Sequence, residues 1–231
     1  MTAPRLALTG VRKHFVAPDG EVQVILDVPE FRIHAGEQVG LHGPSGSGKT
    51  TLLHVIAGLL RADAGHVEVA GHALEALPES GRDRVRARHV GYVFQTFNLL
   101  PGLSALENVA IAMHFAGDVD LDRAHALLAR VGLADRAEYR PRQLSVGQRQ
   151  RVAVARALAN QPALVLADEP TGNLDARRGA ETLAMIREIC SERGAALLLV
   201  SHAPEVLAQF SRTHSLRELN RAPAIDPECR P

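Results

Sequence analysis

The sequence predicts an α/β fold built on a mostly parallel sheet. Residues 163–167 and 195–200 are continuously apolar, as is typical of parallel strands that are buried on both faces. The stretch between them, roughly 177–193, predicts the helix that crosses over from one such strand to the next. A third apolar run, at 38–41, precedes a glycine-rich loop and a helical stretch. Strand, loop and helix in this order are typical of proteins that bind phosphates.

The N-terminal part predicts a different sheet. Residues 5–42 alternate apolar and polar side chains, with a turn at Pro18-Asp19-Gly20, which predicts several antiparallel strands leading into the first core strand. Residues 63–74 predict a hairpin that continues this sheet, and residues 91–94 predict another strand, which ends at Gln95.

Residues 104–159 are predicted to be mostly helical. In one of these helices Leu121, Leu128 and Val131 share an apolar face, and Gly132 ends the helix. We therefore expect a single domain over residues 1–221, with a helical subdomain at about 96–158. The proline-rich residues 222–231 are predicted to be a disordered tail.

Composition limits the class of protein. The 231 residues are 46% hydrophobic but only 3% aromatic, and 26 basic residues balance 26 acidic ones. The zero net charge argues against a dedicated nucleic-acid surface. Cys190 and Cys229 lack metal-type spacing. Because we find no apolar signal segment and no apolar run of about 18 residues, we expect a cytosolic protein that does not span a bilayer.

The glycine-rich loop is the strongest functional signal. Residues 43–50, Gly-Pro-Ser-Gly-Ser-Gly-Lys-Thr, fit the pattern G-x-x-x-x-G-K-[ST]. Glycines let backbone N–H groups approach phosphates, the lysine adds a compact positive charge, and the hydroxyl is placed to ligate Mg²⁺. The chain has only two lysines, Lys13 and Lys49. A chance Gly/Ser turn is the alternative, and the flanking strand and helix disfavour it.

Three further signals are weaker alone. Asp168 and Glu169 end the strand at 164–167, where they could serve a metal and a water; solvated acids at a strand end are the alternative. Ser145 precedes an apolar helical run and could cap an anion-binding helix, or simply an ordinary amphipathic one. His202 follows the last buried strand; an unremarkable histidine is the alternative.

Together these residues resemble the nucleotide-binding cassette of ABC transporters over about residues 5–215. Leu144-Ser145-Val146-Gly147-Gln148 looks like the signature that separates this family from other phosphate-loop proteins. The order also matches: phosphate loop, glutamine after a strand, signature, Asp-Glu strand and histidine. The resemblance implies a P-loop NTPase core with a mostly parallel sheet, an N-terminal antiparallel β subdomain and an α-helical subdomain.

The resemblance also implies a role for each site residue. ATP and Mg²⁺ are the implied cofactors. Catalysis would involve Glu169 as general base, with His202 at the γ-phosphate, Gln95 sensing Mg²⁺ and the attacking water, and Lys49. Thr50 would ligate Mg²⁺, with Gln95 and Asp168 around it. The implied nucleotide-binding residues are Phe15, which would stack on adenine, Gly43, Pro44, Ser45, Gly46, Ser47, Gly48, Lys49, Thr50, Thr51, Ser145, Gly147, Gln148 and Asp175.

Some positions depart from the family pattern. Phe15 stands where tyrosine is usual, but stacking needs only an aromatic face. Val146 replaces a glycine of the signature, and Ala203 stands where aspartate is frequent. After residue 212 the usual closing strand pattern is missing, so the family pattern does not predict the C-terminal edge of the fold.

The resemblance implies two kinds of partner. A second cassette, expected to be identical, would place its signature on the ATP held by this chain in a head-to-tail sandwich. Integral membrane permease subunits would dock at the apolar loop 95–101, whose residues Phe97, Leu99 and Leu100 could equally be core. The expected location is the cytoplasmic face of a bacterial inner membrane. No nucleic-acid partner is expected.

Residues 91–101 and 106–109 look most like cassettes of the lipoprotein-release and macrolide-export group. The primary hypothesis is therefore an ATP-hydrolysing transporter subunit that serves export or lipoprotein release. The alternative is an ATP-driven clamp on a membrane complex that transports nothing, such as a cell-division assembly. A soluble ABC ATPase of translation or DNA repair is disfavoured, because the chain has one cassette and no long coiled-coil insertion.

Overall fold

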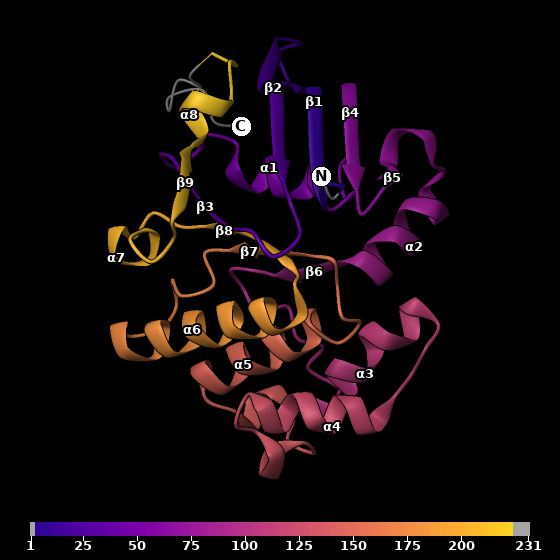
Figure 1. Ribbon diagram of the computed structural model, residues 1–231, viewed down its shortest axis with the longest axis vertical. Coiled ribbons are helices and arrows are strands. Elements are labelled where there is room, and N and C mark those ends of the chain that lie inside the picture. Colours follow the sequence, from indigo (N-terminus) through magenta and orange to yellow (C-terminus); the bar gives the residue numbers. More distant parts are fainter. Residues whose placement is uncertain (1–2, 224–231) are drawn as a thin grey trace.

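The computed structural model describes residues 3–223, which form two sheets and a layer of helices (Figure 1). The larger sheet is parallel and has the strand order β6-β7-β8-β3-β9. Its strands are β3 (Gln38–His42), β6 (Val90–Val93), β7 (Leu164–Asp168), β8 (Ala196–Val200) and β9 (Arg212–Ser215). Both β7 and β8 are buried along their whole length, as their continuous apolar sequences predict.

The second sheet is antiparallel and has the order β2-β1-β4-β5. It consists of β1 (Leu6–Val16), β2 (Val22–Ile33), β4 (Ala64–Val69) and β5 (His72–Ala73). The predicted hairpin at 63–74 is confirmed, since β4 pairs with β5. Gly65 allows a close approach within this sheet, because a Cβ atom there would lie 2.2 Å from the Gly10 carbonyl oxygen.

The helices lie on two sides of the parallel sheet, as Figure 1 shows. One side carries α1 (Lys49–Ile56) and the antiparallel sheet, and the other carries the helices from α3 to α6. The remaining bounds are α2 (Glu79–His89), α3 (Ala105–Ala116), α4 (Leu121–Arg130), α5 (Val146–Ala157), α6 (Ala176–Arg193), α7 (Pro204–Leu207) and α8 (Leu216–Leu219), with 3₁₀ turns at η1 (Leu74–Ala76), η2 (Ala134–Arg136) and η3 (Pro141–Gln143).

The parallel sheet separates two hydrophobic cores. Along β7, Leu164 and Leu166 face the core shared with α1 and the antiparallel sheet. Val165 and Ala167 face the core shared with the helical layer. This alternation follows from the two-residue period of a strand, and it fixes the carboxyl end of β7 between the two halves of the molecule. The predicted α/β class with its parallel, antiparallel and helical parts is confirmed.

Two details differ from the sequence-based expectations. Leu121 begins α4 and is 52% exposed, whereas Leu128 and Val131 are fully buried. Leu121 is the first residue of α4, and its side chain there is left largely in solvent. The C-terminal edge is closed by β9, which pairs with β3 although its sequence, Arg-Thr-His-Ser, is polar. An edge strand has one unpaired side, so apolar alternation is not required there.

The predicted tail at 222–231 lies almost entirely outside the described residues. Within residues 3–223, no helix combines the length and the apolar character needed to cross a membrane.

Candidate functional site

The glycine-rich loop joins the carboxyl end of β3 to the first turn of α1. Gly48 caps α1 with a φ of 94°, a conformation that favours glycine. A Cβ atom at this position would also lie 3.1 Å from the Ile25 Cγ2 atom and 3.2 Å from the Ile25 carbonyl oxygen. The loop therefore packs closely on β2, and its backbone N–H groups lie at the N-terminus of a helix, where anions are stabilised.

Two polar side chains of the loop, Lys49 and Ser47, can form hydrogen bonds beyond those that the described residues supply. The Lys49 ammonium group donates hydrogen bonds of 2.8 Å to the carbonyl oxygens of Gly43 and Pro44. Burial lowers the pKa of Lys49, although the neighbouring carboxylates of Glu169 and Asp168 oppose this shift. The Ser47 hydroxyl is buried and has no hydrogen-bond partner within the described residues. A bound anion would supply the acceptors that these groups lack.

Thr50 and Asp168 meet although 118 positions separate them. The Thr50 hydroxyl donates a 2.9 Å hydrogen bond to the Asp168 Oδ2 atom. Asp168 ends β7 and is only 6% exposed. Burial raises its pKa, the Thr50 hydrogen bond lowers it, and the nearby Glu169 charge raises it further. A hydroxyl and a carboxylate are the hard oxygen donors that suit Mg²⁺, so the residues present fit the predicted ion.

Glu169 continues directly from Asp168 in an unusual backbone conformation. Its φ is 46°, which is rare for a residue with a side chain and is found disproportionately at functional sites. Its carboxylate is held by its neighbours at the end of β8: the Nδ1 atom of His202 lies 2.7 Å from Oε1, and the Ser201 hydroxyl donates to Oε2 at 3.4 Å. The His202 side chain is 75% exposed, whereas that of Glu169 is 11% exposed. The pair therefore presents an oriented acid with an accessible imidazole beside it.

Other predicted residues surround this centre or lie on connecting loops. Gln95 is exposed after β6, and its backbone carbonyl accepts a 2.8 Å hydrogen bond from the Asn173 side chain. Asp175 caps α6 by accepting a hydrogen bond from the Arg178 N–H group. Phe15 is 43% exposed on β1, with the Lys13 ammonium 5.4 Å from its ring centroid.

The predicted signature, residues 144–148, lies at the start of α5 and outside the group formed by the phosphate loop, Asp168 and Glu169. Ser145 and Gln148 form a reciprocal capping box at the start of α5, with hydrogen bonds of 3.2 and 2.9 Å. Gly147 is buried and Val146 is 39% exposed. A cleft of about 230 Å³ beside them is also lined by Arg151 and Arg178. Among residues 3–223, no hydrogen bond joins the segment 144–148 to the loop 43–50.

The structure thus brings Lys49, Thr50, Asp168, Glu169 and His202 together, and leaves Ser145, Gly147 and Gln148 outside that group. Sequence reasoning did not single out Gln150, which is 1% exposed and donates a 2.8 Å hydrogen bond to the Pro170 carbonyl oxygen. This bond ties α5 to the loop that follows Glu169. A glutamine on the buried face of a helix was the only signal in the sequence.

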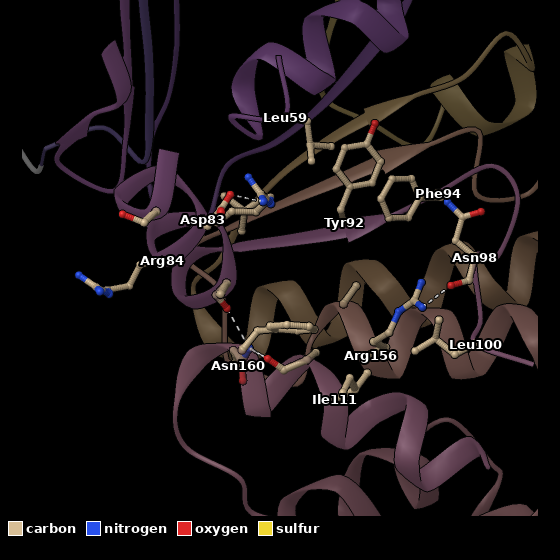
Figure 2. A pocket seen from close by; sticks show the side chains of 17 residues that line it. Leu59, Asp83, Arg84, Tyr92, Phe94, Asn98, Leu100, Ile111, Arg156 and Asn160 are labelled. Carbon is tan, nitrogen blue, oxygen red and sulfur yellow. Dashed lines mark hydrogen bonds and ion pairs between the residues drawn. The ribbon is translucent and has the colours of Figure 1, made fainter. Parts of the chain in front are cut away.

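A groove of about 700 Å³ lies between α2, α3 and the loop after β6 (Figure 2). Apolar side chains such as Phe94, Leu100 and Ile111 line it. At its floor the Asn160 side chain donates 2.8 Å hydrogen bonds to the carbonyl oxygens of Ala87 in α2 and Ala112 in α3. None of residues 43–50 lines this groove, so it is separate from the phosphate loop.

Comparison with known proteins agrees with these observations. A family model described as ABC transporter matches residues 26–172, which contain the phosphate loop, the capping box and the Asp168-Glu169 pair. The chain belongs to the ABC transporter family. This assignment confirms the family resemblance that its motifs indicate.

The relatives of this ABC cassette include proteins named for lipoprotein release and for macrolide export. A lipoprotein-releasing system ATP-binding protein LolD 2 from Rhodospirillum rubrum is 46% identical over 94% of this chain and 95% of its own length. A macrolide export ATP-binding/permease protein MacB from Bradyrhizobium diazoefficiens is 44% identical, again over 94% of this chain. The cassette spans only 34% of that relative's length, so it corresponds to one part of a longer protein.

The fold is shared with a solved structure. A dimeric ATP-binding cassette in a post-hydrolysis state, bound to ADP and Pi, matches with a TM-score of 0.83 and 35% identity. The match covers 91% of this chain and 93% of the other.

Proposed function

We propose that this cassette is the ATPase subunit of a membrane transporter. The observation that carries the proposal is the assembled group of Lys49, Thr50, Asp168 and Glu169 at the carboxyl edge of the parallel sheet. The lipoprotein-release and macrolide-export names of its relatives support the transporter class. None of the relatives reported above is named for cell division, so the alternative of a non-transporting clamp is not favoured.

The chemistry follows from the side chains. The triphosphate of ATP would lie on the loop 43–51, where the Lys49 ammonium exchanges its two carbonyl acceptors for phosphate oxygens. Mg²⁺, held through Thr50 with Asp168 beside it, would neutralise charge on the phosphates. Glu169 would accept a proton from the attacking water. Its contact with His202 fixes the carboxylate, and the exposed imidazole would reach the γ-phosphate.

A second cassette would complete the site. Ser145 is exposed, and within residues 3–223 no hydrogen bond joins its capping box to the phosphate loop. A two-fold arrangement would bring the signature of one chain to the ATP held by the other. The dimeric structure with ADP and Pi supports this arrangement. ATP would thus hold two chains together, and hydrolysis would release them.

The membrane partner would dock in the groove beside the loop 95–101. Leu100 in that loop is 46% exposed and lines the groove, whereas Leu99 packs against the helical core. This proposal places the cassette on the cytoplasmic face of the inner membrane, as a peripheral subunit bound to a permease.

Release of inorganic phosphate from ATP in the presence of Mg²⁺ tests the proposal that this cassette is an ATPase. We expect turnover in the wild type and none above background in Lys49→Ala. We also expect Lys49→Arg to be inactive, because a planar guanidinium cannot replace a compact ammonium on this loop. Both variants should retain the melting temperature of the wild type within about 2 °C. Equal turnover in the wild type and Lys49→Ala would exclude the proposal.

A further inference from the structure

The antiparallel sheet contacts the phosphate loop at a β-bulge. The register between β1 and β2 shifts between Lys13 and His14, which makes Ile25 of β2 the extra residue of the bulge. This residue packs on the loop, since a Cβ atom at Gly48 would lie 3.1 Å from its Cγ2 atom and 3.2 Å from its carbonyl oxygen. Bulges bend a strand and re-aim the side chains beside them. Phe15 follows His14 directly, so the bulge helps to set where its ring lies relative to the phosphate loop.

Phe15 carries an exposed aromatic ring on the side of β1 that faces α1. Side chains alternate along a strand, so Val11, Lys13 and Phe15 share one face. Val11 is fully buried in the core that also contains Leu52 of α1, whereas Phe15 is 43% exposed. The ring therefore continues the core-facing side of β1 beyond the core, where it offers an aromatic surface to a ligand. Such a surface suits a nucleobase, because every base has a face that can stack.

Asp63, the residue before β4, holds both residues at the register shift. Its carboxylate accepts a 2.9 Å hydrogen bond from the Lys13 ammonium and a 2.7 Å hydrogen bond from the His14 N–H group. The His14 Nδ1 atom lies 2.9 Å from the same carboxylate, and the Asp63 N–H group donates to the Arg12 carbonyl oxygen at 2.8 Å. Burial raises the pKa of Asp63, but the hydrogen bonds from His14 and Lys13 outweigh burial and lower the pKa below its usual value.

Lys13 connects this carboxylate to the aromatic ring. Its ammonium lies 5.4 Å from the centroid of the Phe15 ring, within the range of a cation–π contact. The Lys13 side chain is only 15% exposed, so Asp63 and the ring hold it in place. Because the ammonium lies over one face of the ring, a base would stack on the other. Asp63, Lys13 and Phe15 thus form a chain of contacts from the start of β4 to the exposed ring.

We propose that Asp63 is a positioning residue for the nucleobase: by holding Lys13 and His14, it keeps the Phe15 ring where the base of a nucleotide on the phosphate loop stacks. The inference rests on the proposed function, because it takes ATP as the ligand and Phe15 as the residue that stacks on adenine. It adds the device that aligns the base site with the phosphate site. Since this device acts on the base and not on the γ-phosphate, Asp63 should govern KM for ATP rather than kcat.

Two ligands separate the base from the phosphates: ADP carries adenine, and pyrophosphate does not. In calorimetric titrations of the full chain with Mg²⁺, Asp63→Ala should bind ADP about tenfold more weakly than the wild type does. Its affinity for pyrophosphate should stay within about twofold of the wild-type value. Equal losses for the two ligands would assign Asp63 to the phosphate loop or to the fold and overturn the inference, and so would an unchanged affinity for ADP.

A more conservative substitution covers the case in which Asp63→Ala does not fold. Asp63→Asn keeps the shape of the side chain but loses the charge that holds Lys13, and charge-assisted hydrogen bonds are about twice as strong as neutral ones. It should weaken binding of ADP at least about threefold and leave binding of pyrophosphate unchanged. An affinity for ADP equal to that of the wild type would contradict the role of the ion pair.

Asp27→Ala is the matched control. Asp27 pairs with Arg12 at 3.1 Å in the same sheet, but Arg12 lies on the opposite face of β1 from Phe15. Loss of this pair should change the affinity for ADP less than about twofold. In steady-state hydrolysis, Asp63→Ala should raise KM for ATP about tenfold with kcat within about twofold, and Asp27→Ala should change neither. A lower kcat with an unchanged KM in Asp63→Ala would contradict a role in positioning the base.

A double-mutant cycle shows whether Asp63 acts through the ring. Phe15→Ala should weaken binding of ADP about tenfold. Addition of Asp63→Ala should then weaken it little further, because the ring that Asp63 positions is gone. Additive losses would overturn the inference. Unchanged affinity for ADP in Phe15→Ala would also overturn it by removing the base stacking, whereas the ATPase proposal would still stand on phosphate release and its loss in Lys49→Ala.

Discussion

The phosphate-loop region and the signature region are built in opposite ways. Around the phosphate loop, residues far apart in the sequence contact one another: Thr50 meets Asp168, and Glu169 meets His202. In the signature region, Ser145 and Gln148 are close in the sequence and hydrogen-bond to each other in a capping box, and Ser145 is exposed. The first region is assembled within one chain. The second presents an exposed serine at the start of α5, which we propose meets the ATP held by a partner chain.

The largest expected effect separates catalysis from assembly within the phosphate-loop region. Glu169→Gln keeps the shape of the side chain but cannot accept a proton, so phosphate release should fall about 10²- to 10⁴-fold. ATP binding should survive, and sedimentation should show dimers in ATP and Mg²⁺ that dissociate when ATP is removed. Glu205→Gln, an exposed acid on α7, is the control and should behave as the wild type. Monomers of Glu169→Gln under saturating ATP would argue against the sandwich.

A smaller effect is expected from a substitution in the signature. Ser145→Ala removes a helix cap and should lower stability by about 1 kcal/mol. Ser104 caps α3 with the same kind of capping box, formed with Glu107, so Ser104→Ala should lower stability by a similar amount. Only Ser145→Ala should also reduce phosphate release, by about tenfold or more. If both variants lose activity equally, the cap at Ser145 serves only the fold.

Substitution of one glycine in each region should change stability to different extents. Gly48→Ala forces a side chain into a left-handed conformation against Ile25, and should lower stability by about 2 kcal/mol. Gly147→Ala meets only ordinary contacts, the nearest being the Arg178 Cδ atom at 3.6 Å, so its melting temperature should stay near that of the wild type. Its ATP-dependent dimerisation should weaken, because the added methyl group alters the signature segment that would face the partner's ATP. Thermal unfolding of both variants, together with sedimentation in ATP, checks this.

The smallest expected effect is a gain in stability. Because the pKa of Asp168 is raised by burial, its charged form is disfavoured in the folded state. Asp168→Asn keeps an acceptor for Thr50 and should raise the melting temperature of the nucleotide-free chain by about 2 °C at pH 7. The destabilisation by the Asp168 charge is complete above the pKa of Asp168 in the folded protein. It disappears as the pH falls toward the pKa of an aspartate in the unfolded chain, near 4. The difference in melting temperature between the wild type and Asp168→Asn should therefore shrink at low pH. The Asp168→Asn variant should also lose Mg²⁺-dependent hydrolysis of ATP.

The two regions also differ in how far sequence could predict them. The phosphate loop, β7 and β8 were predictable because local pattern decides them: glycines at fixed spacing and continuous apolar runs. The hydrogen bond between Thr50 and Asp168 and the left-handed backbone of Glu169 depend on tertiary placement, and no local pattern encodes them. The same holds for β9, whose polar sequence pairs only because β3 offers a free edge.

The central claim is that each site is completed by a second chain, and mixing two impaired variants tests it most directly. Lys49→Ala has no working phosphate loop and Ser145→Ala has an impaired signature, so homodimers of the first should be inactive and homodimers of the second should keep about one tenth of wild-type activity or less. Mixed dimers hold one site with both parts intact, so an equal mixture should recover up to about one quarter of wild-type phosphate release. If loop and signature of the same chain served one site, no mixture could restore activity, and a mixture as inactive as its components would contradict the account.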